Sequence, residues 1–253
     1  MERPADRYLV VYGRQPVREL LGSRDVTVAK VFVSERARGD AVDAIASAAA
    51  RRGVTLERVR EEMVTAVSRN GRHHQGVVAD VVAPGLQTLG AFLERRSHGR
   101  GHRTSVLVLD GVHNPANVGM IIRSATAAAL DGVVVPRRGT AELGPLVFKA
   151  SAGVAFRAPL VRCDTSADAV TELAAARFTI VGLDARAEAG SLFDAELPER
   201  AAYVLGNEAT GVSTPVAALV DRWLRIPLSS GVESLNVANA ATLLAFEVAR
   251  RRR

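Results

Sequence analysis

Residues 105–124, SVLVLDGVHNPANVGMIIRS, contain an apolar run, a polar loop and an apolar-faced segment in immediate succession. A short continuous apolar run such as Val106–Leu109 is typical of a strand that is buried on both faces. Asn114-Pro115 favours a turn, and the following residues 116–129 have the apolar spacing of a helix. This stretch therefore predicts the strand–loop–helix unit of an α/β fold.

The same alternation continues from residue 105 to the end of the chain. It predicts a mostly parallel sheet with helices on both faces. The further strands are expected at 132–136, 178–184, 201–206 and 222–228, and the further helices at 166–177, 213–220 and 234–250.

Residues upstream form a second, shorter pattern of strands and helices. Expected strands lie at 8–13, 30–34, 54–59 and 76–82, with helices at 40–53 and 61–69. The polar, glycine-interrupted stretch RRSHGRGHRT (95–104) has the composition of a linker. We therefore predict a small α/β domain over 1–83, a linker over 84–104 and a larger domain over 105–253.

The charge of the chain is concentrated in its first part. Of 253 residues, 33 are Lys or Arg and 27 are Asp or Glu, which gives a net charge of +6. Residues 1–104 hold 18 basic and 12 acidic residues, whereas the remainder is balanced. Arginine accounts for 31 of the basic residues, so genome composition is one explanation. The uneven distribution of charge favours a second explanation, in which the N-terminal part is a module that binds a polyanion such as RNA.

Targeting and redox signals are weak. The sequence has no apolar run long enough to span a bilayer, and its N-terminus lacks the apolar core of a signal peptide. The single cysteine, Cys163, cannot form an internal disulfide. We expect a cytoplasmic protein.

Three polar, glycine-containing loops follow predicted strands, at 110–124, 205–213 and 226–236. Ligands of open α/β sheets bind at the carboxyl ends of strands. Taken singly, each loop has a structural explanation, because Asn117 could cap a helix and Gly211 could serve a turn. A Rossmann site is excluded because the first loop lacks Gly-x-Gly-x-x-Gly, and neither lysine lies in a P-loop context. No ligand cluster predicts a metal site.

Together, the three loops resemble the motifs of the SpoU/TrmH family of RNA ribose 2′-O-methyltransferases, in the SPOUT superfamily. The first motif is similar at Asn117, Gly119 and Arg123, the second at Gly206, Glu208 and Gly211, and the third at Ile226-Pro227 and Ser234–Val237. The resemblance implies a deep trefoil knot in the larger domain, S-adenosylmethionine as cofactor, and a homodimer. It implies catalytic roles for Arg123, Asn117, Glu208, Ser234 and Asn236. It implies cofactor contacts from Leu205, Gly206, Ile226, Leu228, Leu235 and Val237.

Arg123 is the residue that the resemblance places at the target ribose hydroxyl. A guanidinium is a poor proton acceptor, so we favour electrostatic stabilisation of the developing alkoxide over a general-base role. The resemblance assigns Asn117 and Glu208 to orienting Arg123, and Ser234 and Asn236 to the cofactor pocket and the target nucleotide. The last helix is apolar on more than one face, which suits a dimer interface or a two-layer core.

The first 83 residues are similar to the substrate-binding domain of this family, which itself resembles RNA-binding ribosomal proteins. The similarity lies in Gly13–Val17 and His74–Val77. It implies RNA contacts from Arg14, Arg72, His74 and Gln75, although residues 74–76 could also be a simple turn. The separate N-terminal domain favours large-subunit (23S) ribosomal RNA as substrate. A transfer RNA ribose, an antibiotic-resistance methylation of ribosomal RNA, and a non-catalytic RNA-binding or ribosome assembly factor stay open as alternatives.

Overall fold

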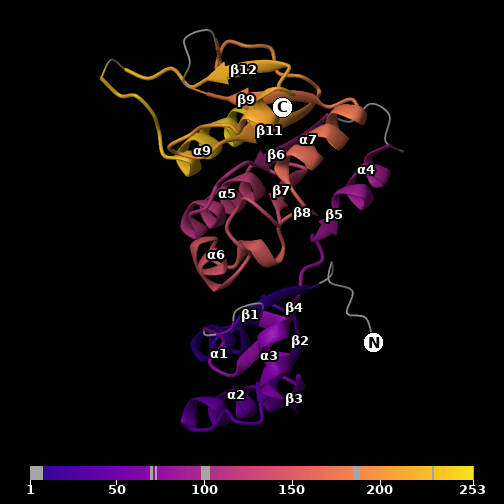
Figure 1. The fold of residues 1–253 in the computed structure, drawn as a ribbon, viewed down its shortest axis with the longest axis vertical. Coiled ribbons are helices and arrows are strands. Elements are labelled where there is room, and N and C mark those ends of the chain that lie inside the picture. The colour runs from indigo at the N-terminus through magenta and orange to yellow at the C-terminus, as the bar shows by residue number, and fades with distance from the viewer. Residues whose placement is uncertain are drawn as a thin grey trace. The chain divides into compact units, whose positions relative to one another are not determined.

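A computed structural model describes residues 8–68, 71, 73–97, 103–184, 189–229 and 231–252. The contacts divide the chain into two units (Figure 1). One comprises Met1–Pro84 with Leu143–Pro145, and the other comprises Gly85–Glu142 with Leu146–Arg253.

The N-terminal unit contains a four-stranded sheet in the order β1-β4-β2-β3. Strand β4 pairs antiparallel with β1 and β2, while β2 and β3 are parallel. Its core includes Phe32, Val59, Val64 and Val78. The strands are β1 (Tyr8–Tyr12), β2 (Val28–Ser34), β3 (Thr55–Val59) and β4 (Val77–Val82), and the helices are α1 (Arg14–Gly22), α2 (Asp40–Arg51) and α3 (Glu61–Ser68).

The larger unit contains an eight-stranded sheet in the order β10-β12-β9-β11-β6-β7-β8-β5, in which every neighbouring pair is parallel. The predicted α/β class and mostly parallel sheet are confirmed, whereas the knot stays a prediction. The strands are β5 (Gln87–Thr88), β6 (Thr104–Leu109), β7 (Gly132–Pro136), β8 (Leu160–Cys163), β9 (Thr179–Leu183), β10 (Gly190–Ser191), β11 (Arg200–Leu205) and β12 (Arg222–Arg225).

Helices cover both faces of this sheet. Helix α7 packs against β6–β9, and α5 packs against α9 on the opposite side in Figure 1. All residues of β6 and β7 are buried, as a parallel sheet between two helical layers requires. The helices are α4 (Leu89–Ser97), α5 (Pro115–Ala127), α6 (Pro145–Ala150), α7 (Ser166–Ala175), α8 (Thr214–Ala217) and α9 (Val237–Arg251), with a 3-10 turn at Val154–Phe156.

The stretch 84–104, which we predicted as a linker, contains β5 and α4. Leu89 and Phe92 are buried in the core of the larger unit, and Leu93 packs against it. The Arg96 guanidinium, 2.9 Å from the Asp131 carboxylate, ties the same helix to the sheet. The polar composition of 95–104 concealed this helix, whose apolar face lies at 89, 92 and 93, just upstream.

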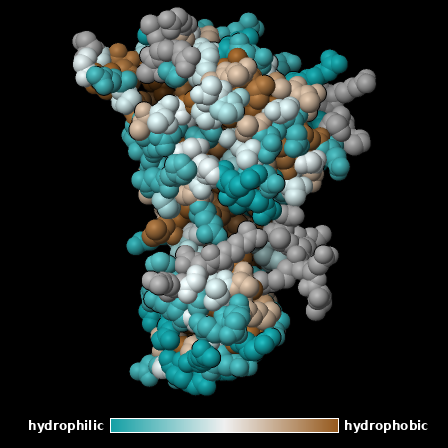
Figure 2. All heavy atoms as spheres, in the orientation of Figure 1, coloured by the Kyte–Doolittle hydropathy of each residue, from teal (hydrophilic) through white to brown (hydrophobic). Residues whose placement is uncertain are grey.

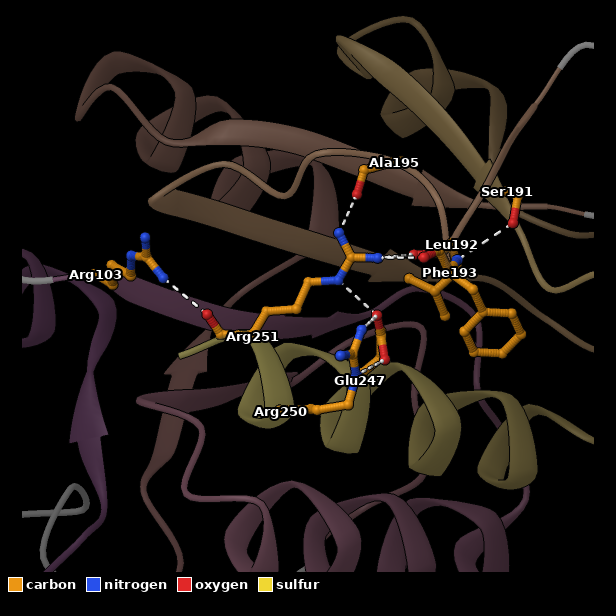
Figure 3. A network of polar contacts seen from close by, with 8 residues as sticks. All are labelled: Arg103, Ser191, Leu192, Phe193, Ala195, Glu247, Arg250 and Arg251. Carbon is orange, nitrogen blue, oxygen red and sulfur yellow. Dashed lines mark hydrogen bonds and ion pairs between the residues drawn. The ribbon is translucent and has the colours of Figure 1, made fainter. Parts of the chain in front are cut away.

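The end of α9 is held by the buried carboxylate of Glu247 (Figure 3). Arg250 donates to both of its oxygens at 2.8 and 2.9 Å, and the Arg251 Nε donates to it at 2.5 Å. Arg251 also donates to the carbonyl oxygens of Phe193 and Ala195, both at 2.5 Å. The hydrogen bonds from Arg250, and next from Arg251, lower the pKa of Glu247 from 4.5 to about 2, against the opposing effect of burial.

We expect Glu247→Gln to lower the free energy of unfolding at neutral pH by about 1–3 kcal/mol, because charge-assisted hydrogen bonds are lost. The folded-state pKa lies below the unfolded value, so the contribution is complete above about pH 4.5 and is lost as the pH falls toward about 2. Urea unfolding at several pH values measures the difference.

The matched control is Glu199→Gln. Glu199 is 80% exposed and lies 3.8 Å from the Arg103 Nε, so its replacement should change stability by less than about 1 kcal/mol. Equal effects of the two substitutions would contradict a special role for Glu247.

Candidate active site

The strand order brings the three polar loops to one edge of the sheet. Strands β11 and β6 are neighbours, and β12 is separated from β11 only by β9. Because all of these strands are parallel, their carboxyl ends meet at the same edge. The loops after β6, β11 and β12 are therefore adjacent, together with the end of β9.

The side chain of Asn117, near the start of α5, joins the three loops. Its Nδ2 donates to the Glu208 Oε1, and its Oδ1 accepts from the Asn236 Nδ2 at 3.1 Å. Asn236 in turn caps α9, because its Oδ1 accepts from the Ala238 N–H at 2.9 Å. Asn114, not Asn117, caps α5, with its Oδ1 2.9 Å from the Ala116 nitrogen. Asn117 is thus a link between loops and not the helix cap that it could have been.

The loop after β11 is closed by Asn207, which the sequence analysis did not single out. Its backbone exchanges two hydrogen bonds of 2.9 Å with Gly211, and its Nδ2 donates to the Gly111 carbonyl at 2.8 Å. A Cβ atom at Gly206 would lie closer than 3.0 Å to the backbone of Gly211 and Val212. Only glycine permits this close approach.

A second residue that the sequence analysis missed is Asp110, which is buried at the end of β6. Its carboxylate accepts from the Ser166 hydroxyl and from the Ser213 backbone N–H, both at 2.6 Å. These bonds tie the end of β6 to the starts of α7 and α8. An acidic residue directly after a buried strand was the only signal that could have indicated it.

The loops enclose a cavity of about 390 Å³. All six predicted cofactor residues line it, and so do the predicted catalytic residues Glu208 and Ser234. Two carboxylates, from Asp184 and Glu208, face a largely apolar wall. The described lining residues include no Lys, Arg or His, and they are Leu183, Asp184, Leu205–Gly211, Ile226, Leu228, Ser234, Leu235, Val237 and Ala240.

Arg123 is not hydrogen-bonded to Asn117, Glu208 or Asn236. It is exposed on α5 and makes no hydrogen bond or ion pair with another described residue. Six residues along an α-helix correspond to about 9 Å and about 240° of rotation, so Arg123 and Asn117 lie on different faces. Within one chain Arg123 therefore points away from Asn117 and Glu208, and the expected role of these two residues in orienting it stays a prediction.

Beside Arg123, α5 and α9 present an exposed apolar surface. Ser124 and Thr242 hydrogen-bond across the two helices at 2.7 Å. Met120, Leu243 and Phe246, within about one helical turn of that contact, are 39–50% exposed. Leu244 and Val248 are buried, so α9 uses one apolar face for the core and leaves another outside.

Three of the predicted RNA-binding residues, Arg14, His74 and Gln75, lie close together in the N-terminal unit, whose visible face in Figure 2 is mostly hydrophilic. Arg14 hydrogen-bonds to Gln75, through its backbone N–H to Oε1 at 3.1 Å and through Nε to the carbonyl at 3.2 Å. His74 is buried, which corrects the expectation that its imidazole contacts RNA directly. Arg72 lies outside the described residues.

Two other classes of site receive no support. The described parts of the chain contain no helix with the length and hydropathy of a membrane span. In the same residues, no three His, Cys, Asp or Glu side chains are grouped so that they could hold a metal ion.

Comparison with known protein families identifies both units. A profile of the SpoU rRNA methylase family matches residues 104–246. A second profile, described as RNA 2′-O ribose methyltransferase substrate binding, matches residues 10–86.

Among individual proteins, a Staphylococcus aureus protein assigned to the TrmH family of tRNA/rRNA methyltransferases is 30% identical over 243 residues. The match covers 96% of each chain. The SpoU methyltransferase AviRb from Streptomyces viridochromogenes, solved with AdoMet, has a similar fold, with a TM-score of 0.63 and 24% identity over 97% of this chain and 90% of its own. A third solved structure, which concerns the 2-OH methylation of C/U34 on tRNA, has a TM-score of 0.51 and 29% identity. The match covers 59% of this chain and 97% of its own.

We expect Gly206→Ala to destabilise the protein by about 1–3 kcal/mol, because the added methyl group overlaps backbone atoms that cannot move independently. Thermal or urea unfolding measures this loss. Gly90→Ala in α4 is the control, since a Cβ there meets no atom within 4 Å and should leave stability equal or higher. A Gly206→Ala protein as stable as the Gly90→Ala protein would contradict the close approach.

Proposed function

The chain belongs to the SpoU rRNA methylase family of RNA methyltransferases, and we propose that it methylates a ribose 2′-hydroxyl of large-subunit ribosomal RNA with S-adenosylmethionine as donor. The observation that carries this proposal is that Asn117 hydrogen-bonds to both Glu208 and Asn236 and so joins the three loops beside a cavity that Glu208 and Ser234 line. The substrate-binding profile over residues 10–86, whose description names 2′-O ribose methylation, supports the position of the methyl group.

The cavity suits S-adenosylmethionine in size and charge. Its volume lies in the range of small-molecule sites, about 300–1,000 Å³. Leu205, Ile226 and Leu228 offer apolar walls for an adenine ring, and the close-packed Gly206 loop exposes backbone polar groups to its edge. The carboxylates of Asp184 and Glu208 favour a ligand with positive charge over a nucleotide polyphosphate.

When bound, S-adenosylmethionine supplies an electrophilic methyl group on a sulfonium centre. In the proposed reaction the methyl group would pass from sulfur to a ribose 2′-oxygen, and the hydroxyl proton would pass to water. Arg123 stabilises the developing negative charge on that oxygen with its guanidinium. Asn117 holds Glu208 and Asn236 in position relative to each other through its two hydrogen bonds. Ser234 and Asn236 contact the target nucleotide from the third loop.

A homodimer brings Arg123 to a cofactor cavity. Within one chain Arg123 faces away from the Asn117 link and lies beside the exposed side chains of Met120, Leu243 and Phe246. Contiguous exposed apolar side chains mark interaction surfaces. We infer that a second copy covers this surface, so that Arg123 of one protomer serves the cavity of its partner.

Transfer RNA is the second candidate substrate. It is favoured by the TrmH assignment of the staphylococcal relative and by the structure concerned with tRNA methylation. That structure covers only 59% of this chain, and the additional RNA-binding profile at the N-terminus favours ribosomal RNA.

The test of the activity is to map 2′-O-methyl groups in total RNA after incubation with enzyme and S-adenosylmethionine. We expect one new site in large-subunit RNA with the natural protein and none with Arg123→Ala. Because Arg123 lies outside the cavity lining, the variant should bind the cofactor with unchanged affinity by calorimetry. A new site in tRNA would favour the second candidate, and full activity of Arg123→Ala would exclude the proposed role.

From the proposed dimer we expect that the double variant Leu243→Glu/Phe246→Glu is a monomer, and light scattering measures its mass. This double variant should keep its fold, because both side chains are exposed, and should lose methyl transfer by at least about a hundredfold, as expected when a transition-state contact is removed. Met63→Glu, at an exposed position in α3, is the control and should change neither mass nor activity. An active monomer would contradict the shared site.

A further inference from the structure

The N-terminal unit contains a buried histidine whose contacts extend to an arginine at the surface. We propose that His74 is a positioning residue, which holds the Arg14 guanidinium in place as a contact for an RNA phosphate. This inference rests on the proposed function, because it concerns how the RNA substrate is bound.

Both ring nitrogens of His74 have partners inside the unit. The Gly76 backbone N–H donates to Nδ1 at 3.0 Å, and Nε2 lies 3.1 Å from the Thr65 hydroxyl and 3.7 Å from the Glu61 carboxylate. Because Nδ1 accepts, the single proton of the neutral ring is on Nε2, from which it is donated toward Thr65. The imidazole is 3% exposed and acts through its neighbours.

The bond to Gly76 fixes the backbone around Gln75. Gln75 has a φ of +52°, in the left-handed region that is unfavourable for a residue with a side chain. Such a conformation persists only where the surroundings hold it. Here the His74–Gly76 bond holds one side, and the two hydrogen bonds from Arg14 hold the other.

Arg14 receives a fixed orientation from the same contacts. Its Nε donates to the Gln75 carbonyl, so the plane of the guanidinium is set by the position of that oxygen. The two terminal nitrogens make no hydrogen bond to another described residue, and they carry N–H donors that match phosphate oxygens. A displaced Gln75 carbonyl would leave Arg14 charged but no longer oriented.

Salt dependence separates this role from a purely structural one. Each phosphate that a protein neutralises releases counterions, and loss of one such contact lowers the slope of log affinity against log salt by about one. His74 carries no charge when Nδ1 accepts a hydrogen bond. A substitution of His74 can therefore lower the slope only by displacing a charged group such as Arg14.

The experiment compares two polar substitutions in the full-length protein. His74→Asn keeps an acceptor near the Nδ1 position and can still bind the Gly76 N–H, whereas His74→Gln places its amide near the Nε2 position and cannot. Binding of a fluorescein-labelled RNA hairpin with an internal loop is followed by anisotropy over a range of salt concentrations. Circular dichroism and calorimetry with S-adenosylmethionine verify the fold of each variant.

We expect Arg14→Gln to lower the salt slope by about one, His74→Gln to lower it equally, and His74→Asn to leave it near that of the natural protein. The double variant Arg14→Gln/His74→Gln should show no further loss, because both changes remove the same contact. Equal slopes for His74→Gln and the natural protein, or independent losses in the double variant, would overturn the positioning role alone. A natural protein that binds no RNA would overturn the proposed function as well. If His74→Gln fails to fold, Gln75→Gly replaces it in the comparison, because a glycine loosens the backbone carbonyl that accepts from the Arg14 Nε, and it should lower the salt slope as Arg14→Gln does.

Discussion

The order of donors and acceptors through Asn236, Asn117 and Glu208 is the constraint on which the site depends. The Asn236 oxygen caps α9, so only its Nδ2 remains to donate to Asn117. Asn117 must then accept with its oxygen and donate with its nitrogen, and the group that it meets must be an acceptor, which Glu208 provides. One helix cap thus determines the orientation of two amides and the identity of a third side chain. Asn117 is buried, so the loss of either partner would leave a buried amide without a hydrogen bond, whereas Glu208 and Asn236 are exposed and can bind water instead.

Much of this arrangement could be predicted from the sequence, because buried parallel strands have unbroken apolar runs. The strands at 105–110, 201–206 and 222–228 and the polar loops after them were all predicted from pattern alone. Asp110 and Asn207 were missed because a polar residue in a loop gives no indication of its partner, and their partners are backbone groups of distant segments. Helix α4 was missed for a different reason, since its charged last turn and the glycines after it hid an apolar face of three residues.

Side-chain direction was the least predictable property. His74 was expected to contact RNA, yet its side chain is buried, and Arg123 is exposed on a face of α5 that points away from the loops of its own chain. In a short strand or a loop, the spacing of apolar residues does not tell which side chains are buried. A helix of thirteen residues has side chains in every direction around its axis, so spacing alone does not tell which of them faces a site. The resemblance named the residues as a set, which stays a prediction, while the contacts between them follow only from the structure.

The cavity of the larger unit differs in electrostatic character from the first part of the chain, although each of the two units has a net charge of +3. Residues 1–104 carry the whole net charge of +6, as binding to a polyanion requires. The cavity in the other unit is lined by two carboxylates, and its described lining includes no basic side chain. An arginine-lined cavity beside a phosphate backbone would bind the RNA itself and compete with the small cation that it is proposed to hold. The proposed site therefore leaves the attraction for RNA to arginines outside the cavity lining, such as Arg123 on the exposed face of α5.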